Sequence, residues 1–174
     1  MFTLAYQTPE KAAGVAADVY QHFTQKRSPV PAPLQLMSAS PGLLEVFFTQ
    51  IKYFMKHQAL SFPMLAAIRL LAAQKVCFDH CTMLNRMWLN KTGLSEQDLA
   101  DLVAGKPVEA FNEAENALFT TVSRVLDKQK ITQEEVAALR NLGWSDSDVL
   151  DACAQATNMV GNAYLFEAFS TPGT

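Results

Sequence analysis

The sequence predicts an all-α protein, and three observations support that prediction. Apolar residues recur at the three- and four-residue spacing of amphipathic helices along nearly the whole chain. No run of residues alternates between apolar and polar with the two-residue period of a β-strand. Helix-start signals, Pro and Gly punctuate the pattern often enough for seven or eight helices. Because 174 residues is the size of one domain, we expect a single helical domain over residues 1–174.

The first third of the chain contains three predicted helix starts. Pro9 opens the first amphipathic helix, because proline fits the first helical position, and the apolar pattern continues to Phe23. Residues 28–40 are rich in proline and are expected to form a connector. Pro41 and Ser61 then mark the starts of the second and third helices.

Residues 64–92 contain neither glycine nor proline, so the sequence alone would permit one long helix there. A helix of that length would extend for about 43 Å, which is close to the diameter expected of the whole domain. We therefore predict a break in this segment. Asp79 is the residue best suited to begin the next helix, as its N-cap.

The second half of the chain has clearer boundaries. Residues 93–98 (GLSEQD) and 143–148 (GWSDSD) each combine a helix stop with a Ser-x-x-Asp cap. Between them the pattern predicts one helix around 107–127 and another that begins at Thr132. A long final helix is expected over residues 146–169.

Composition excludes several classes of protein. The net charge of −3 argues against a nucleic-acid partner, because phosphate binding requires a concentrated basic face. No apolar run reaches the length of a membrane span, and the N-terminus lacks the pattern of a secretory signal. Three cysteines form no disulfide framework, so we expect free thiols and a cytoplasmic protein.

Cys77, His80 and Cys81 lie together in the segment VCFDHC, and their spacing has several readings. The cysteines could be two buried core residues, because free cysteine is often buried. They could also be a redox pair. Positions four apart in a helix have Cβ atoms about 5–6 Å apart, against about 3.8 Å in a disulfide, so a disulfide requires the helix break. The three residues could also seed a zinc site, but a fourth ligand is missing, and we expect neither a metal ion nor another cofactor.

Arg69 lies in the middle of the apolar segment LAAIRLLAA. Burying an unpaired guanidinium is costly, so Arg69 needs a carboxylate, carbonyl groups, a subunit interface or a route to solvent at the helix edge. The functional alternative is a residue that binds the carboxylate of a small substrate. Lys75 and Arg86 flank the same region and could contribute, and Asp79 and His80 are the nearby candidates for an acid or base.

The order of these parts resembles the AhpD-like, or carboxymuconolactone decarboxylase, superfamily across nearly the whole chain. The resemblance rests on four segments in the family's order: SASPGLLEVF, LAAQKVCFDHC, GLSEQDL and LRNLGWSDSDVLDACAQATN. It implies an all-helical fold that assembles into homo-oligomers. In the family's redox members the site is Cys-x-x-Cys-x-x-x-His with a glutamate upstream. The second cysteine attacks a peroxide, the first resolves it, and His and Glu relay the proton.

This sequence departs from the redox pattern at three positions. If Cys81 matches the attacking cysteine, Phe78 stands at the resolving position, and the spare cysteine is Cys77. Asn85 replaces the relay histidine, and Ala66 stands where the glutamate would be. The resemblance therefore assigns Cys81 as the attacker, with Cys77 as a possible resolver and His80 or Asn85 as a poor substitute for the relay.

Three functions remain open from the sequence. The first is thiol-dependent reduction of a peroxide at Cys81. The second is a non-thiol enzyme of the decarboxylase branch that acts on a small carboxylate or lactone, with Arg69 binding the substrate. The third is a catalytically inactive small-molecule-binding or oligomeric protein. A surplus of apolar side chains over residues 47–55 and 83–88, in two neighbouring helices, favours a homo-oligomer.

Overall fold

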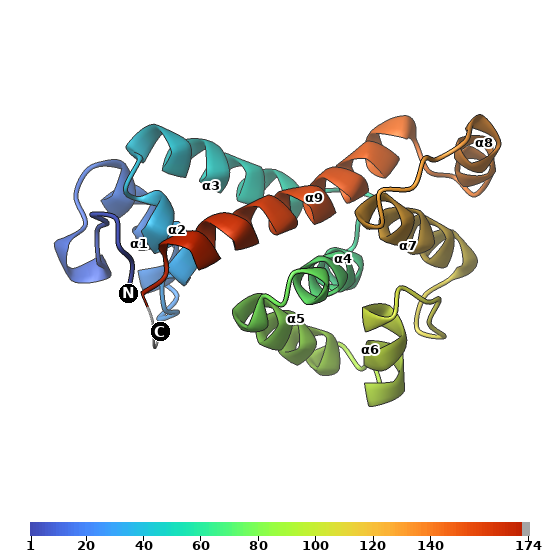
Figure 1. Cartoon of the computed structure of the whole chain (residues 1–174), viewed down its shortest axis with the longest axis horizontal. Coiled ribbons are helices and arrows are strands. Elements are labelled where there is room, and N and C mark those ends of the chain that lie inside the picture. Colours follow the sequence, from blue (N-terminus) through green and yellow to red (C-terminus); the bar gives the residue numbers. More distant parts are fainter. Residues whose placement is uncertain (172–174) are drawn as a thin grey trace. The chain divides into compact units, whose positions relative to one another are not determined.

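The computed structural model describes residues 1–171, and these residues confirm the all-α prediction (Figure 1). Their only strand-like feature is an isolated bridge between Phe2 and Ser170. A short 3-10 helix, Pro9–Lys11, comes first. The α-helices that follow are α1 (Val15–Thr24), α2 (Ala32–Met37), α3 (Pro41–Met55), α4 (Phe62–Lys75), α5 (Asp79–Lys91), α6 (Glu96–Val103), α7 (Glu113–Leu126), α8 (Gln133–Asn141) and α9 (Asp146–Phe169).

Two differences from the predicted elements lie in the N-terminal region. The helix expected from Pro9 to Phe23 is divided: the first turn ends at Lys11, Ala12 is extended, and Gly14, with a φ of +55°, is the N-cap residue of α1. The proline-rich connector contains α2, for which proline occupies an early helical position. The described residues therefore form nine α-helices rather than seven or eight.

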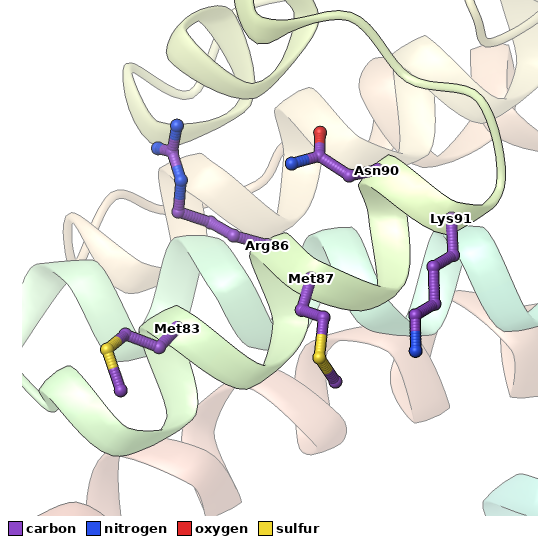
Figure 2. A pocket seen from close by; sticks show the side chains of 5 residues that line it. All are labelled: Met83, Arg86, Met87, Asn90 and Lys91. Carbon is purple, nitrogen blue, oxygen red and sulfur yellow. The ribbon is translucent and has the colours of Figure 1, made fainter.

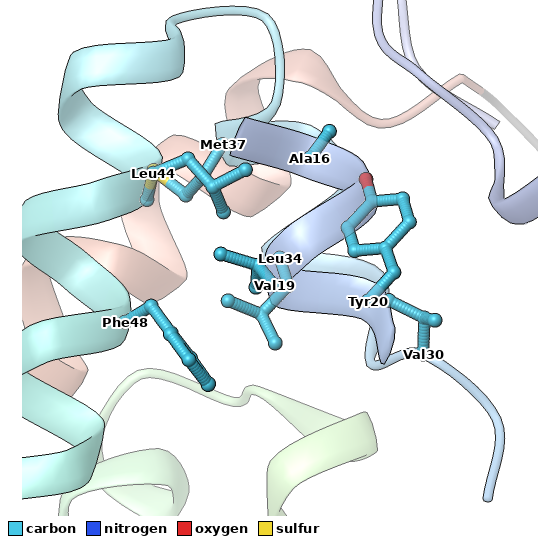
Figure 3. Close-up of a cluster of buried hydrophobic side chains, with 8 residues drawn as sticks. All are labelled: Ala16, Val19, Tyr20, Val30, Leu34, Met37, Leu44 and Phe48. Carbon is cyan, nitrogen blue, oxygen red and sulfur yellow. The ribbon is translucent and has the colours of Figure 1, made fainter. Parts of the chain in front are cut away.

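Backbone contacts divide the chain into two compact units, and α9 contributes residues to both. The first unit comprises Met1–Lys56 and the C-terminal residues from Tyr164. Its core joins α1, α2 and α3, as Figure 3 shows. The buried side chains of this core are Ala16, Val19, Tyr20, Val30, Leu34, Met37, Leu44 and Phe48.

The second unit, His57–Ala163, is built around α4. Nine of the 14 residues of α4 are buried, which means that apolar neighbours surround this helix. Helices α5, α6 and α7 all pack against it. The predicted Ser-x-x-Asp cap of α6 is confirmed as a reciprocal capping box between Ser95 and Asp98. No helix within residues 1–171 is long and apolar enough to cross a membrane.

The predicted break between residues 64 and 92 is confirmed, and it sets the site described below. Helix α4 ends at Lys75, Cys77 has a φ of +53°, and α5 begins at Asp79. The amide of Phe78 donates to the carbonyl of Ala73 at 2.8 Å, and the amide of Cys77 donates to that of Gln74 at 3.3 Å. This pair of hydrogen bonds is the Schellman arrangement, in which the residue after a helix adopts a left-handed conformation.

The prediction that Asp79 caps α5 is wrong. Phe78 is the N-cap residue and makes no side-chain cap hydrogen bond, while Asp79 is the first residue inside the helix. The end of α4 fixes the turn instead, because Phe78 is buried and its amide is held by Ala73. The carboxylate of Asp79 still lies in the first turn, where the helix dipole favours a negative charge.

Candidate functional site

Three residues that the sequence singled out meet where α4 packs against α5. The Nε of Arg69 on α4 donates to Oδ1 of Asn85 on α5 at 3.0 Å. The Nδ2 of Asn85 donates to the backbone carbonyl of Cys81, one turn earlier, at 2.7 Å. Asn85 is only 1% exposed, so its hydrogen bond to Cys81 is buried, while the one from Arg69 is partly buried. Asn85 therefore connects the guanidinium of Arg69 to the backbone of Cys81.

Arg69 lacks the carboxylate partner that a buried cation would ordinarily have. Within residues 1–171, no Asp or Glu oxygen lies within 4.0 Å of its guanidinium. Its two Nη atoms have no hydrogen-bond acceptor in this part of the chain. They reach solvent, because no buried side-chain nitrogen or oxygen here is without a partner. Burial lowers the pKa of Arg69 to about 10, which leaves it positively charged at neutral pH.

Cys81 lies in the first turn of α5, as the predicted break requires, but its side chain is only 8% exposed. Burial raises the pKa of this thiol to about 11, and the opposing charge of Arg69 offsets only part of that shift. A thiol with such a pKa is almost entirely protonated at neutral pH. The helix N-terminus and Arg69 therefore do not produce an activated thiolate in this site.

The other two members of the cysteine segment lie outside this cluster. Cys77 is exposed in the turn between α4 and α5, and His80 is exposed on the first turn of α5. All three cysteines of the chain are free thiols. Cys77 precedes α5 and so does not share a regular helix with Cys81, but one thiol is at the surface and the other is buried. No cluster of three or more metal-ligating side chains occurs within the described residues.

The neighbouring charged residues are engaged elsewhere. Lys75 Nζ pairs with Asp127 Oδ1 at 2.5 Å, and Arg86 Nη2 pairs with Glu96 Oε2 at 2.6 Å. Asp79, which was predicted together with His80 as a candidate acid or base, is exposed. Arg69 is consequently the only cation in the α4–α5 cluster, and Cys81 is its only other titratable group.

Two aromatic residues that were not predicted as site residues complete the surroundings of Arg69. The guanidinium carbon of Arg69 lies 5.9 Å from the ring centroid of Phe62 and 5.6 Å from that of Trp88. Spacing in the sequence could have identified both rings. Phe62 precedes Arg69 by seven residues, and Trp88 follows Cys81 by seven, so each shares a helix face with a site residue.

A separate hollow lies on the outer face of α5, away from this cluster. It is shallow, has a volume of about 560 Å³ and is lined by Met83, Arg86, Met87, Asn90 and Lys91. Figure 2 shows Met87 and Lys91 extending to one side of the helix and Arg86 and Asn90 to the other. Arg86 and Asn90 both bind Glu96, which holds this side of the hollow against the start of α6.

Comparison with known proteins gives a result at the level of the fold. A scan against protein-family models finds no match, and a search of curated proteins finds no similar sequence. Among solved structures, the chain is similar to an uncharacterized peroxidase-related protein from Silicibacter sp. TM1040, with a TM-score of 0.72. The similarity covers 90% of this chain and 85% of that protein, at 15% sequence identity. The two proteins therefore share a fold.

Proposed function

We propose that this protein is an AhpD-like protein whose α4–α5 cluster binds a small organic anion, with Arg69 as the binding residue. One observation carries the proposal: Arg69 is a partly buried cation with no carboxylate near it in the described part of the chain. Only the Asn85 amide, the two aromatic rings and solvent meet this charge, so a bound anion would stabilise it further. Because Asn85 holds Nε, the two Nη atoms are left to bind a carboxylate in a bidentate manner.

Titration with small carboxylates such as acetate, propionate and benzoate, followed by calorimetry, tests this proposal. Wild-type protein should bind at least one of them, and Arg69→Gln should lose that binding. Arg69→Lys should bind more weakly, because lysine keeps the charge but lacks the fork of two donors. Arg86→Gln is the matched control, since it removes an arginine that is already paired with Glu96. Binding that survives Arg69→Gln in a folded variant would refute the proposal.

Thiol-dependent peroxide reduction is the second candidate. The break before α5 supports it, because it places Cys81 in a first turn with unpaired amide groups. In this reaction the Cys81 thiolate attacks a peroxide oxygen, and the alkoxide that leaves takes up a proton. The sulfenic acid formed on Cys81 then condenses with the thiol of Cys77, which yields a disulfide and releases water. The burial of Cys81 argues against rapid reaction at neutral pH.

The pH dependence of alkylation distinguishes the two candidates. With Cys77 and Cys153 changed to alanine, we expect Cys81 to react slowly at pH 7 and faster as the pH rises toward about 11. The direction follows from the raised pKa, since only the thiolate reacts and it forms at high pH. An apparent pKa below about 7.5 would instead favour the peroxidase. Peptide mass analysis of the wild-type protein after peroxide treatment would then show whether Cys77 and Cys81 lose two hydrogens together.

A further inference from the structure

The rings of Phe62 and Trp88 form an aromatic wall beside the cation of the proposed site. Their centroids are 5.6 Å apart with an angle of 62° between the planes, so the two rings support each other edge to face. Both lie within 6 Å of the guanidinium carbon of Arg69. The aromatic wall and Arg69 therefore form one surface. Phe62 and Trp88 provide its apolar part, and the guanidinium provides its charge.

This surface is open to a ligand from solvent. Phe62, the first residue of α4, is 50% exposed, although it is a large apolar side chain. Trp88 is partly exposed, and the Nη atoms of Arg69 reach solvent. A carboxylate bound to the Nη atoms would bring the body of its molecule beside the aromatic wall. The exposed part of Phe62 would then be covered, which is favourable for an apolar surface.

The charge of the cluster favours a ligand with a single negative charge. Arg69 is its only cation, because Lys75 and Arg86 are paired with Asp127 and Glu96. A phosphate or a dicarboxylate would bring a second negative charge that no free cation in the cluster could offset. A monocarboxylate matches the charge that the site provides.

We propose that the Arg69 site selects monocarboxylates with a flat, conjugated ring over saturated ones of the same size and charge. This inference rests on the proposed anion-binding function and adds the substrate class to it. A flat ring can stack on or pack edge to face with Phe62 and Trp88, and such aromatic pairs add to the effect of burial alone. A saturated ring covers the same surface without that contribution. Phe62 and Trp88 are then specificity-determining residues, and Arg69 is the anchor.

Benzoate and cyclohexanecarboxylate are the matched probes, because they share the carboxylate and the six-membered ring and differ in planarity. By calorimetry on the full chain, we expect benzoate to bind about three- to tenfold more tightly. Phe62→Leu should reduce this preference to less than about twofold while leaving some binding of both acids. Arg69→Gln should abolish the binding of both. Lys91→Gln, in the hollow on the outer face of α5, should change neither affinity.

The outcomes separate this inference from the function on which it rests. If both acids bind through Arg69 with equal affinity, the aromatic selection is wrong and the anion site stands. If neither acid binds wild-type protein, the anion site itself is wrong. If Phe62→Leu leaves the preference intact, Trp88→Leu is measured next, and a preference that survives both variants overturns the inference. Binding that depends on Lys91 would place the ligand in the hollow and overturn it as well.

Discussion

Cys77 adopts a backbone conformation that is unfavourable for any residue with a side chain. Its φ is +53°, and the residues that follow several other helices of the chain also have a positive φ. Gly93, Gly105 and Gly143 occupy the equivalent position after α5, α6 and α8, where glycine carries no steric cost. The left-handed conformation costs other residues about 1–2 kcal/mol. Cys77 is therefore a poor residue for this turn on conformational grounds alone.

Cys77→Gly should stabilise the protein. We expect the free energy of unfolding in urea to rise by about 1 kcal/mol, because glycine relieves the left-handed strain and Cys77 buries little surface. Cys77→Ala is the matched control and should bring no such gain, since alanine also has a Cβ atom. Equal effects of the two substitutions would show that the turn has a different conformation in solution.

At the scale of helices, the sequence predicted where helices begin better than it predicted the turns between them. Ser61, Ser95 and Thr132 cap their helices as expected, because a capping side chain acts within three residues. No glycine or proline marks the break at Cys77 in the sequence. Only the length of the segment without these residues predicted that the helix would be interrupted. Asp79 was the wrong cap because the hydrogen bond from Phe78 to Ala73 determines where α5 begins.

For the candidate site, the sequence predicted which residues take part but not how they are arranged. Arg69 and Cys81 could be named from the sequence because a cation in an apolar helix and a cysteine near a helix start are local signals. Asn85 was named only because the family resemblance places the relay histidine at that position. Their mutual arrangement depends on how α4 and α5 are rotated against each other, which spacing along one helix does not determine. The hydrogen bond from Arg69 to Asn85 and the contact of Arg69 with Trp88 are consequences of that rotation.

Substituting alanine for glycine should have opposite effects on stability at two positions. Gly161 lies inside α9, and an added Cβ would meet no atom within 4 Å. Gly161→Ala should raise the free energy of unfolding by about 1 kcal/mol, because alanine is the better helix former. Gly105 has a φ of +70°, and a Cβ there would lie 2.3 Å from Oγ of the buried Ser123.

Gly105→Ala should consequently destabilise the protein by more than about 1 kcal/mol, through strain in the backbone and a clash with Ser123. Urea denaturation of both alanine variants measures the contrast. A stable Gly105→Ala protein would contradict the packing of the turn after α6 against α7.

At the scale of the whole molecule, several large apolar side chains remain at the surface. On α3, Leu43, Val46 and Tyr53 are each about half exposed or more, at 48%, 67% and 50%. They are three and seven residues apart, so they lie on one face of the helix. Burying the exposed part of each side chain against another surface would contribute on the order of 1 kcal/mol. A monomer leaves this face of α3 in water.

We therefore predict that the protein forms a homo-oligomer that buries this face of α3. Sedimentation equilibrium should give a mass that is a multiple of the 19.2 kDa chain. Changing Leu43 and Val46 together to glutamate should shift the protein toward the monomer, because burying two carboxylates in an apolar contact is costly. Leu150→Glu is the control, since Leu150 is also exposed but belongs to α9. A monomeric wild-type protein at every concentration would contradict the prediction, and dissociation by Leu150→Glu alone would move the contact to α9.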